Sequence, residues 1–199
     1  MRVIAGTYRS RRLQTLRGTA LRPSSDRLRE TLFNILGAEI EGSVFLDLFA
    51  GSGAVGIEAL SRGAHGAIFV ENHPAGAALI SRNLASLGIP TAAQVASRRT
   101  FAGTAEILRM AAMDALEQLA NGGAHIDFVF ADPPYANAQA YEDILAFLGE
   151  SELLARGGRM IAEHRRKNDL PKIAGDLERT RVVEQGDSAL SFYQPILAA

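Results

Sequence analysis

Short apolar runs alternate with stretches whose apolar residues recur every three or four positions along most of this chain. Runs of about five apolar residues between turn residues are typical of buried strands, and the wider spacing is typical of helices. The pattern predicts strands over 44–49, 67–71, 105–110, 127–131 and 159–164. It predicts helices over 53–62, 74–87, 114–120 and 138–148. This alternation predicts an α/β fold with a mostly parallel sheet and helices on both faces.

The two ends of the chain depart from this alternation. The first residues predict a short β-hairpin, and Ser24 and Ser25 offer an N-cap to a helix whose apolar residues share one face. Two β runs around Gly186 and Asp187 predict a closing antiparallel hairpin at the other end. Residues 90–104 follow neither period, so we expect a long loop there.

Composition narrows the class of protein. The chain has 199 residues, 47% of them hydrophobic, which suits a globular core. It has no cysteine, and its four histidines are scattered, so we expect no disulfide and no metal site. No apolar run is long enough to span a membrane, and the first residues do not resemble a signal peptide. We expect a cytoplasmic protein and, at this size, a monomer.

Charge is distributed unevenly along the chain. The net charge is −1, yet residues 1–30 hold eight arginines against Asp26 and Glu30, a net of +6. Such an excess at one end favours contact with a polyanion. A solvated tail, or a genomic preference for arginine, is the alternative. We expect a basic extension over 1–38, made of the hairpin and the following helix, and a second domain over 39–199.

The stretch VFLDLFAGSGAVG contains G-x-G-x-x-G, formed by Gly51, Gly53 and Gly56 directly after a predicted strand. Glycines let the backbone approach a ligand, and the helix that follows directs N–H groups toward it. Glu71 ends the next strand, where its carboxylate can accept ribose hydroxyls of either NAD or S-adenosylmethionine. A carboxylate at Asp47 favours a sulfonium over a pyrophosphate. The alternative for Asp47 is a buried carboxylate that holds the backbone of the loop.

The most specific motif is the D-P-P-Y stretch that begins at Asp132, directly after a predicted strand. Its two prolines stiffen the turn and lack N–H donors. The Asp132 carboxylate and the Pro133 carbonyl can accept the two N–H bonds of an exocyclic nucleobase amine, while Tyr135 stacks on the base. This arrangement predicts methylation of an amino group by positioning and by stabilising positive charge on nitrogen. The alternative is a rigid helix entry capped by Asp132.

Five segments together resemble the RsmD-type methyltransferases. They are R-x-x-A-G near the start, RPSSDRLRETLFNIL, FLDLFAGSGAVGIEALSRGA, FADPPY and GDSALSFY, and they extend from about residue 2 to 194. The resemblance implies a Rossmann-like class I fold with seven strands in the order 3-2-1-4-5-7-6, the seventh antiparallel. It implies methyl transfer from S-adenosylmethionine, leaving S-adenosylhomocysteine, to the N2 amine of a guanine. The implied substrate is 16S ribosomal RNA within a small-subunit assembly intermediate.

The resemblance, together with the charge pattern and the position of Asp47, assigns residues to roles. The cofactor set is Asp47, Phe49, Gly51, Ser52, Gly53, Glu71, Asn72, Ala112 and Met113. The catalytic set is Asp132, Pro133, Pro134 and Tyr135. The RNA-binding set is Arg9, Arg11, Arg12, Arg17, Arg22, Arg27 and Arg29, with ion pairing as the alternative for the last three. Many relatives carry an acidic residue where this chain has Ala111, and Asp114 follows three residues later.

Three other functions are compatible with parts of the pattern. The D-P-P-Y turn also serves amino-methyltransferases that act on DNA or on other RNAs. The glycine loop alone would suit an NAD(P)-dependent oxidoreductase. A basic N-terminus would suit an RNA-binding module without catalysis. His73 and His164 are interpreted as surface or helix-start residues rather than as functional ones.

Overall fold

A computed structural model describes residues 1–15, 26–92, 104–134 and 137–196. The chain divides into two compact units, residues 1–111 and residues 112–199. The division at residue 38 expected from the sequence separates a basic extension from a methyltransferase domain. That boundary is a prediction about function, and it differs from the boundary between the two compact units after residue 111.

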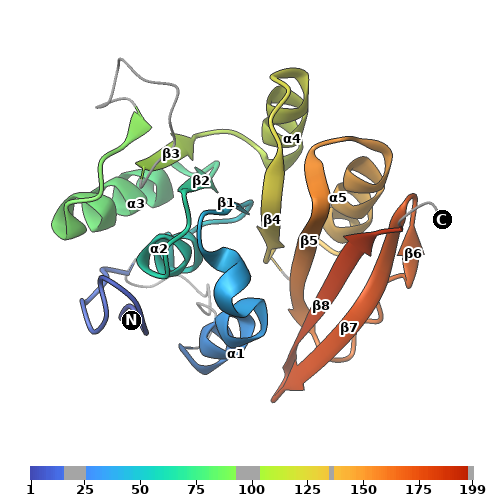
Figure 1. The fold of residues 1–199 in the computed structure, drawn as a ribbon, viewed down its shortest axis with the longest axis horizontal. Coiled ribbons are helices and arrows are strands. Elements are labelled where there is room, and N and C mark those ends of the chain that lie inside the picture. The colour runs from blue at the N-terminus through green and yellow to red at the C-terminus, as the bar shows by residue number, and fades with distance from the viewer. Residues whose placement is uncertain (16–25, 93–103, 135–136, 197–199) are drawn as a thin grey trace. The chain divides into compact units, whose positions relative to one another are not determined.

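The first unit is a three-stranded parallel sheet with helices packed on it (Figure 1). Its strands lie in the order β3-β2-β1, and helix α2 packs on β1 and β2 while α3 packs on β3. Its elements are α1 (Asp26–Leu36), the 3-10 helix η1 (Gly37–Ile40), β1 (Val44–Asp47), α2 (Ala54–Ser61), β2 (Gly66–Val70), α3 (Pro74–Leu87) and β3 (Thr104–Leu108). All five residues of β2 are buried, as expected for a strand covered on both faces.

The N-terminal segment, residues 1–15, is part of the first unit. The antiparallel bridge between Arg2 and Arg12 confirms the predicted hairpin. Its Val3 and Leu13 side chains are buried in one core cluster with residues of α2 and α3. Gly6 has φ +78°, and a Cβ there would overlap the carbonyl of Ser61. The glycine of the R-x-x-A-G motif is therefore required for the hairpin to sit against α2.

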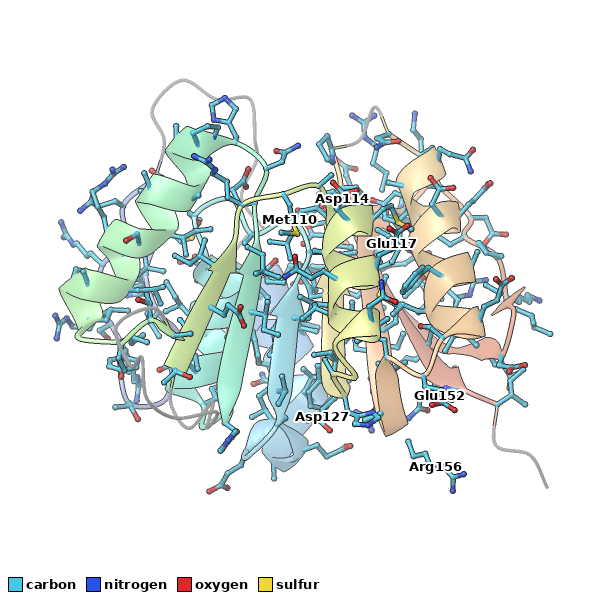
Figure 2. All side chains as sticks on the ribbon, turned by 90° about the horizontal axis from the view of Figure 1, so that it is seen from above. Met110, Asp114, Glu117, Asp127, Glu152 and Arg156 are labelled. Carbon is cyan, nitrogen blue, oxygen red and sulfur yellow. The ribbon has the colours of Figure 1, made fainter. Side chains whose placement is uncertain are left out.

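The second unit has two parallel strands followed by an antiparallel edge (Figure 1). Its strands lie in the order β4-β5-β8-β7-β6. Its elements are α4 (Ala112–Asn121), β4 (Ile126–Ala131), α5 (Gln139–Glu150), β5 (Leu154–Arg165), β6 (Ile173–Ala174), β7 (Leu177–Gln185) and β8 (Ser188–Pro195). Helices α4 and α5 cover the same face of its strands (Figure 2).

The predicted strand order is confirmed within each unit. The first unit has the expected 3-2-1, and the second has the expected 4-5-7-6, in which the seventh strand is β8 and is antiparallel to β5. The two-residue strand β6 is an addition at the edge. The hairpin at Gly186 joins β7 and β8 as predicted. The N-cap proposed at Ser24 or Ser25 and most of the loop predicted over 90–104 lie outside the described residues.

Candidate active site

The loop after β1 is held at the carboxyl end of the strand by Glu71, which follows β2. The Gly51 N–H donates to Glu71 Oε2 over 2.9 Å, and the His73 N–H donates to Oε1 over 2.8 Å. Gly51 and Gly53 have φ of +53° and +79°, a left-handed conformation that glycine adopts without strain. Gly53 then caps the N-terminus of α2. The glycine loop and the acidic residue predicted to act together are therefore in direct contact.

This edge of the first unit fits the ribose and carboxylate parts of a nucleoside cofactor. Each Glu71 oxygen uses one acceptor position on a backbone amide, and a carboxylate has about four such positions, so ribose hydroxyls can still bind. Gly51, Ser52 and Phe49 are half-buried, and Asn72 is exposed beside Glu71. The N-terminal amides of α2 begin directly after Gly53 and suit an anionic group such as a carboxylate.

Asp47 is a buried carboxylate that supports the loop. Its side chain lies in a residue that is 1% exposed, and Oδ2 accepts the Gly56 N–H over 3.2 Å. The supporting role given as the alternative is thus observed, and a direct contact between Asp47 and a cofactor stays a prediction. Burial raises the pKa of Asp47 from 3.8 to about 7, with the charge of Glu71 raising it further and the Gly56 N–H lowering it.

A pH-dependent stability follows from Asp47. Because its pKa is higher in the folded chain, the folded state binds more protons between about pH 4 and pH 7. Stability should therefore fall as pH rises through this window. We expect Asp47→Asn to gain about 1–3 kcal/mol in unfolding free energy relative to wild type between pH 5 and pH 8. Urea unfolding at the two pH values measures it, and Asp114→Asn on α4 is the exposed control. A constant difference between wild type and Asp47→Asn would contradict it.

Two glycines let helices approach the site closely. A Cβ at Gly56 would lie 2.4 Å from the ring of Phe69 on β2, so α2 can pack there only with glycine. A Cβ at Gly76 on α3 would lie 2.7 Å from the Glu71 side chain. Gly56 is therefore a helix-packing residue. The last glycine of the G-x-G-x-x-G pattern lets α2 pack on β2.

Asn83 joins the hairpin to the glycine loop, and no pattern in the sequence indicates this role. This α3 side chain is fully buried. Its Nδ2 donates to the Ser52 carbonyl over 2.9 Å and to the Gln14 carbonyl over 3.1 Å, and its Oδ1 accepts the Gln14 N–H over 2.9 Å. Both N–H donors and the oxygen of the amide thus bind backbone groups from two different segments.

Replacing Asn83 should therefore destabilise the first unit. Asn83→Leu keeps the volume but leaves three backbone groups without this partner, and each such group costs about 1–3 kcal/mol. We expect the unfolding free energy to fall by about 2–4 kcal/mol, measured by urea denaturation. Arg82→Leu, on the exposed side of the same turn, should change it by less than about 0.5 kcal/mol. Equal losses in the two variants would show that the amide is not what matters.

A second buried polar group, Glu58 on α2, holds the start of the hairpin. Its carboxylate accepts the N–H groups of Ile4 and Ala5 over 2.8 Å and 3.0 Å and Nε of Arg62 over 2.8 Å. Arg29 Nε lies 3.8 Å from Glu58 Oε2, and Arg29 Nη2 donates to Asp26 over 3.1 Å. Arg29 is 1% exposed. It is an internal ion-pairing residue, and the contact with RNA expected of it is wrong.

The remaining arginines divide by exposure. Arg9, Arg11, Arg12 and Arg27 are exposed, and their contact with RNA stays a prediction. Arg11 also donates from Nη2 to the Ser86 carbonyl over 2.9 Å, which fixes the hairpin on α3. Arg17 and Arg22 lie outside the described residues.

The D-P-P-Y turn begins at the carboxyl end of β4 in the second unit. The strand ends at Ala131, Asp132 is half-buried, Pro133 is buried and Pro134 is exposed. The Pro134 carbonyl accepts the Asn137 N–H over 2.8 Å, which closes the turn before α5. Asp132 thus stands at a strand end as predicted, while Tyr135 lies outside the described residues.

The start of α4 lies at the same edge of the second unit as this turn. Figure 2 places Asp114, near the start of α4, at the opposite end of the unit from Asp127, which stands at the start of β4. Ala112 and Met113 are half-buried at the start of α4. Their contact with an adenine stays a prediction.

His164 on β5 is an internal residue of the second unit, so its interpretation as a surface residue is wrong. It is 2% exposed, and its Nε2 shares a hydrogen bond of 2.8 Å with Ser191 Oγ on β8. Burial lowers its pKa, so the neutral ring is favoured. His73 is the N-cap of α3, and its Nδ1 accepts the Ala75 N–H, as expected of a helix-start residue.

The described residues lack a metal-binding cluster and a membrane-spanning helix. They hold no group of three or more histidine or acidic side chains placed to bind a metal ion. Within the same residues, no helix has the length and apolar character that a membrane crossing requires.

Known proteins match the chain over nearly its whole length. The family described as conserved hypothetical protein 95 matches residues 1–194. The ribosomal RNA small subunit methyltransferase D of Escherichia coli K12 is 36% identical over 194 residues, which cover 98% of this chain and 89% of that protein. The solved structure of yhhF from Escherichia coli is 33% identical with a TM-score of 0.79, covering 98% and 97% of the two chains.

A more distant structure has the same fold. It is an RNA methyltransferase from Salinibacter ruber in complex with S-adenosyl-L-homocysteine, 16% identical with a TM-score of 0.59, covering 89% of this chain and 96% of that one. Together with the nearer match, it confirms the class I fold expected from the sequence.

Proposed function

We propose that this chain, which belongs to the family described as conserved hypothetical protein 95, methylates the N2 amine of a guanine in small-subunit ribosomal RNA. Membership confirms the resemblance to RsmD-type methyltransferases that the five sequence segments carry. The observation that carries the activity is the D-P-P-Y turn at a strand end, in a chain whose other unit holds a glycine loop on Glu71. The substrate is supported by the near-full-length relative that acts on that RNA.

Within the first unit, Glu71 holds the cofactor's ribose, and the backbone of Gly51, Ser52 and Gly53 holds its methionine part. When bound, S-adenosylmethionine supplies a methyl group on a sulfonium centre, which leaves as the neutral thioether of S-adenosylhomocysteine. Glu71 is supported for this task because its two N–H partners fix the carboxylate against the loop. Phe49 and Asn72 complete the proposed cofactor set of this unit, and Ala112 and Met113 are the cofactor residues proposed in the second unit.

Within the second unit, the turn orients the acceptor amine. The amine's lone pair is delocalised into the guanine ring, so it needs alignment more than it needs a base. The Asp132 carboxylate and the Pro133 carbonyl accept its two N–H bonds, and the negative charge of Asp132 favours the positive charge that develops on nitrogen. Pro133 and Pro134 keep these acceptors in place, and Tyr135 stacks on the base.

The exposed arginines of the N-terminal segment, together with Arg27 of α1, would contact phosphates of the RNA. Exposure to solvent supports a phosphate contact for Arg9, Arg12 and Arg27. Arg11 is also exposed, and its hydrogen bond to the Ser86 carbonyl fixes it on α3. Arg17 and Arg22 complete this proposed set. We propose a monomer that acts in the cytoplasm on a small-subunit assembly intermediate.

Transfer of a labelled methyl group tests the proposal. The purified protein is incubated with labelled S-adenosylmethionine and, separately, with small ribosomal subunits lacking the modification, naked 16S RNA and duplex DNA. We expect label in the small-subunit RNA, mapped by mass to a guanine. Label in DNA alone would refute the RNA substrate and favour the DNA alternative. Calorimetry that detects binding of NAD but not of S-adenosylmethionine would refute the cofactor.

A further inference from the structure

A basic turn begins at Arg165, the last residue of β5, in a unit with a net negative charge. Residues 112–199 carry eight basic and fourteen acidic side chains, a net charge of −6. Three of the eight basic side chains are consecutive, at Arg165, Arg166 and Lys167, and all three residues are exposed. Nothing in the proposed function uses them.

Strand register places this turn beside the D-P-P-Y turn. Strands β4 and β5 are parallel, and Ala131 pairs with Ala162, so Asp132 directly follows the carboxyl end of β4 and Arg165 is the last residue of the adjacent strand β5. With strands about 4.8 Å apart and about 3.3 Å per residue, the backbone of Arg165 lies within about 8–10 Å of Asp132. The second unit alone therefore carries a catalytic turn and a basic turn at one edge.

The basic turn is built into the sheet rather than loosely attached. The Asn168 N–H donates to the Arg165 carbonyl over 2.9 Å, and the buried His164 ring shares a hydrogen bond with the same carbonyl. The Arg166 N–H donates to the Asp187 carbonyl in the β7–β8 hairpin over 2.8 Å. The backbone is fixed from both sides, so the cationic side chains extend from a defined position.

The charges near Arg166 and Lys167 leave these two side chains available to an anion. Arg166 Nη1 lies 3.9 Å from Glu184 Oε2, and both side chains are 58% exposed, so the pair is weak. Lys167 has no acidic partner within the described residues. Asp187 lies in the facing hairpin, and its charge opposes the three cations without cancelling them.

We propose that residues 165–167 bind the phosphates next to the target guanine and so hold the RNA while the D-P-P-Y turn grips the base. This inference rests on the proposed function and adds a second RNA contact that is separate from the N-terminal arginines. Phosphate contacts position a nucleic acid without reading its sequence. A contact in the same unit as Asp132 fixes the base relative to its acceptors directly.

Charge reversal at the chain's only two lysines provides a matched test. Lys167→Glu reverses the charge within the proposed phosphate contact. Lys172→Glu reverses the charge of an exposed lysine outside that contact, in the same segment between β5 and β6. The Lys172 carbonyl accepts the Arg179 N–H. Arg179 on β7 is opposite Tyr193 on β8, and Tyr193 is opposite Met160 on β5. Lys172 is therefore level with Met160, which is five positions before Arg165 in the sequence. That separation is about 16 Å along the strands.

The measurement is affinity for the RNA of the small subunit at several salt concentrations. We expect Lys167→Glu to bind about tenfold more weakly near physiological salt and to lower the salt slope by about 0.7–0.9. The double variant Arg166→Glu with Lys167→Glu should lower the slope about twice as far. Lys172→Glu should change affinity less than twofold. All variants should retain the thermal midpoint and the affinity for S-adenosylmethionine.

The outcomes separate this inference from the proposed function. If wild type methylates the RNA but the double variant binds it with unchanged affinity and slope, this inference alone is overturned. The same holds if Lys172→Glu weakens binding as much as Lys167→Glu, because the effect is then one of general charge. If wild type neither binds nor methylates the RNA, the proposed function fails and this inference fails with it.

Discussion

Replacing Asp132 with alanine is expected to lower the rate of methyl transfer by about 1,000-fold or more, with affinity for S-adenosylmethionine unchanged within a few fold. The expectation follows from where the residue stands. Asp132 is half-buried at the end of β4, in a turn stiffened by two prolines and closed by the Asn137 N–H. Its removal takes away an acceptor that aligns the amine and the charge that stabilises the transition state. It leaves the loop held by Glu71 in the other unit intact.

A conservative variant separates alignment from charge. Asp132→Asn keeps an oxygen that can accept an amine N–H but lacks the negative charge, so we expect a loss of about 10–100-fold, smaller than that of alanine. Asp127→Ala is the matched control, because Asp127 stands at the other end of the same strand (Figure 2). Single-turnover methylation of small subunits and calorimetry with S-adenosylmethionine are the two measurements.

Three results would change the assignment of Asp132. Loss of cofactor binding in Asp132→Ala would make it a cofactor residue. Full methylation by that variant would support the capping alternative. Methylation lost equally in Asp127→Ala would show that β4 is merely sensitive to substitution.

The parallel strands could be predicted because their buried parts are mainly apolar and helical patterns of adequate length separate them. The strand order followed from the family resemblance, and register follows from parallel pairing of buried strands. The strand β6 was missed because two residues carry no periodicity. The start of β5 was missed because Gly157 and Gly158 interrupt its apolar pattern, and Gly157 has φ +80°.

The groups that support the site could not be predicted because their partners are distant in sequence. Glu58 is 54 positions from Ile4, and Asn83 is 69 from Gln14. A glutamate or an asparagine in a helix can be either exposed or buried, and the residue type alone does not indicate which. Arg29 belonged to a basic run, and its charge alone predicted a surface role; only the fold brings Glu58 within 3.8 Å of its guanidinium.

The position of the basic segment also changes what can be tested. Deleting the first twenty residues would remove Val3 and Leu13 from the core of the first unit, so a loss of RNA binding would not separate contact from unfolding. Charge reversal at exposed Arg9 and Arg12 leaves that core intact and is the appropriate test of the N-terminal contact.

Glu58→Ala is expected to lower the free energy of unfolding by on the order of 3–5 kcal/mol, because it leaves the buried Arg29 charge with too little compensation. The side chains of both residues are 0% exposed. Burial already lowers the pKa of Arg29, while the charges of Glu58 and Asp26 raise it. The variant also leaves the amides of Ile4 and Ala5 without their acceptor, which adds to the loss.

A double-mutant cycle apportions this loss. If the Glu58–Arg29 ion pair matters, Arg29→Ala together with Glu58→Ala should cost about 1–3 kcal/mol less than the sum of the two single variants, since neither charge is then left alone. Glu30→Ala, on the exposed side of α1, is the control and should cost less than about 1 kcal/mol. Urea unfolding of the four proteins measures the cycle. Strictly additive losses would show that Glu58 acts only by accepting the backbone amides, and that the buried arginine is held by Asp26 and the Arg2 carbonyl instead.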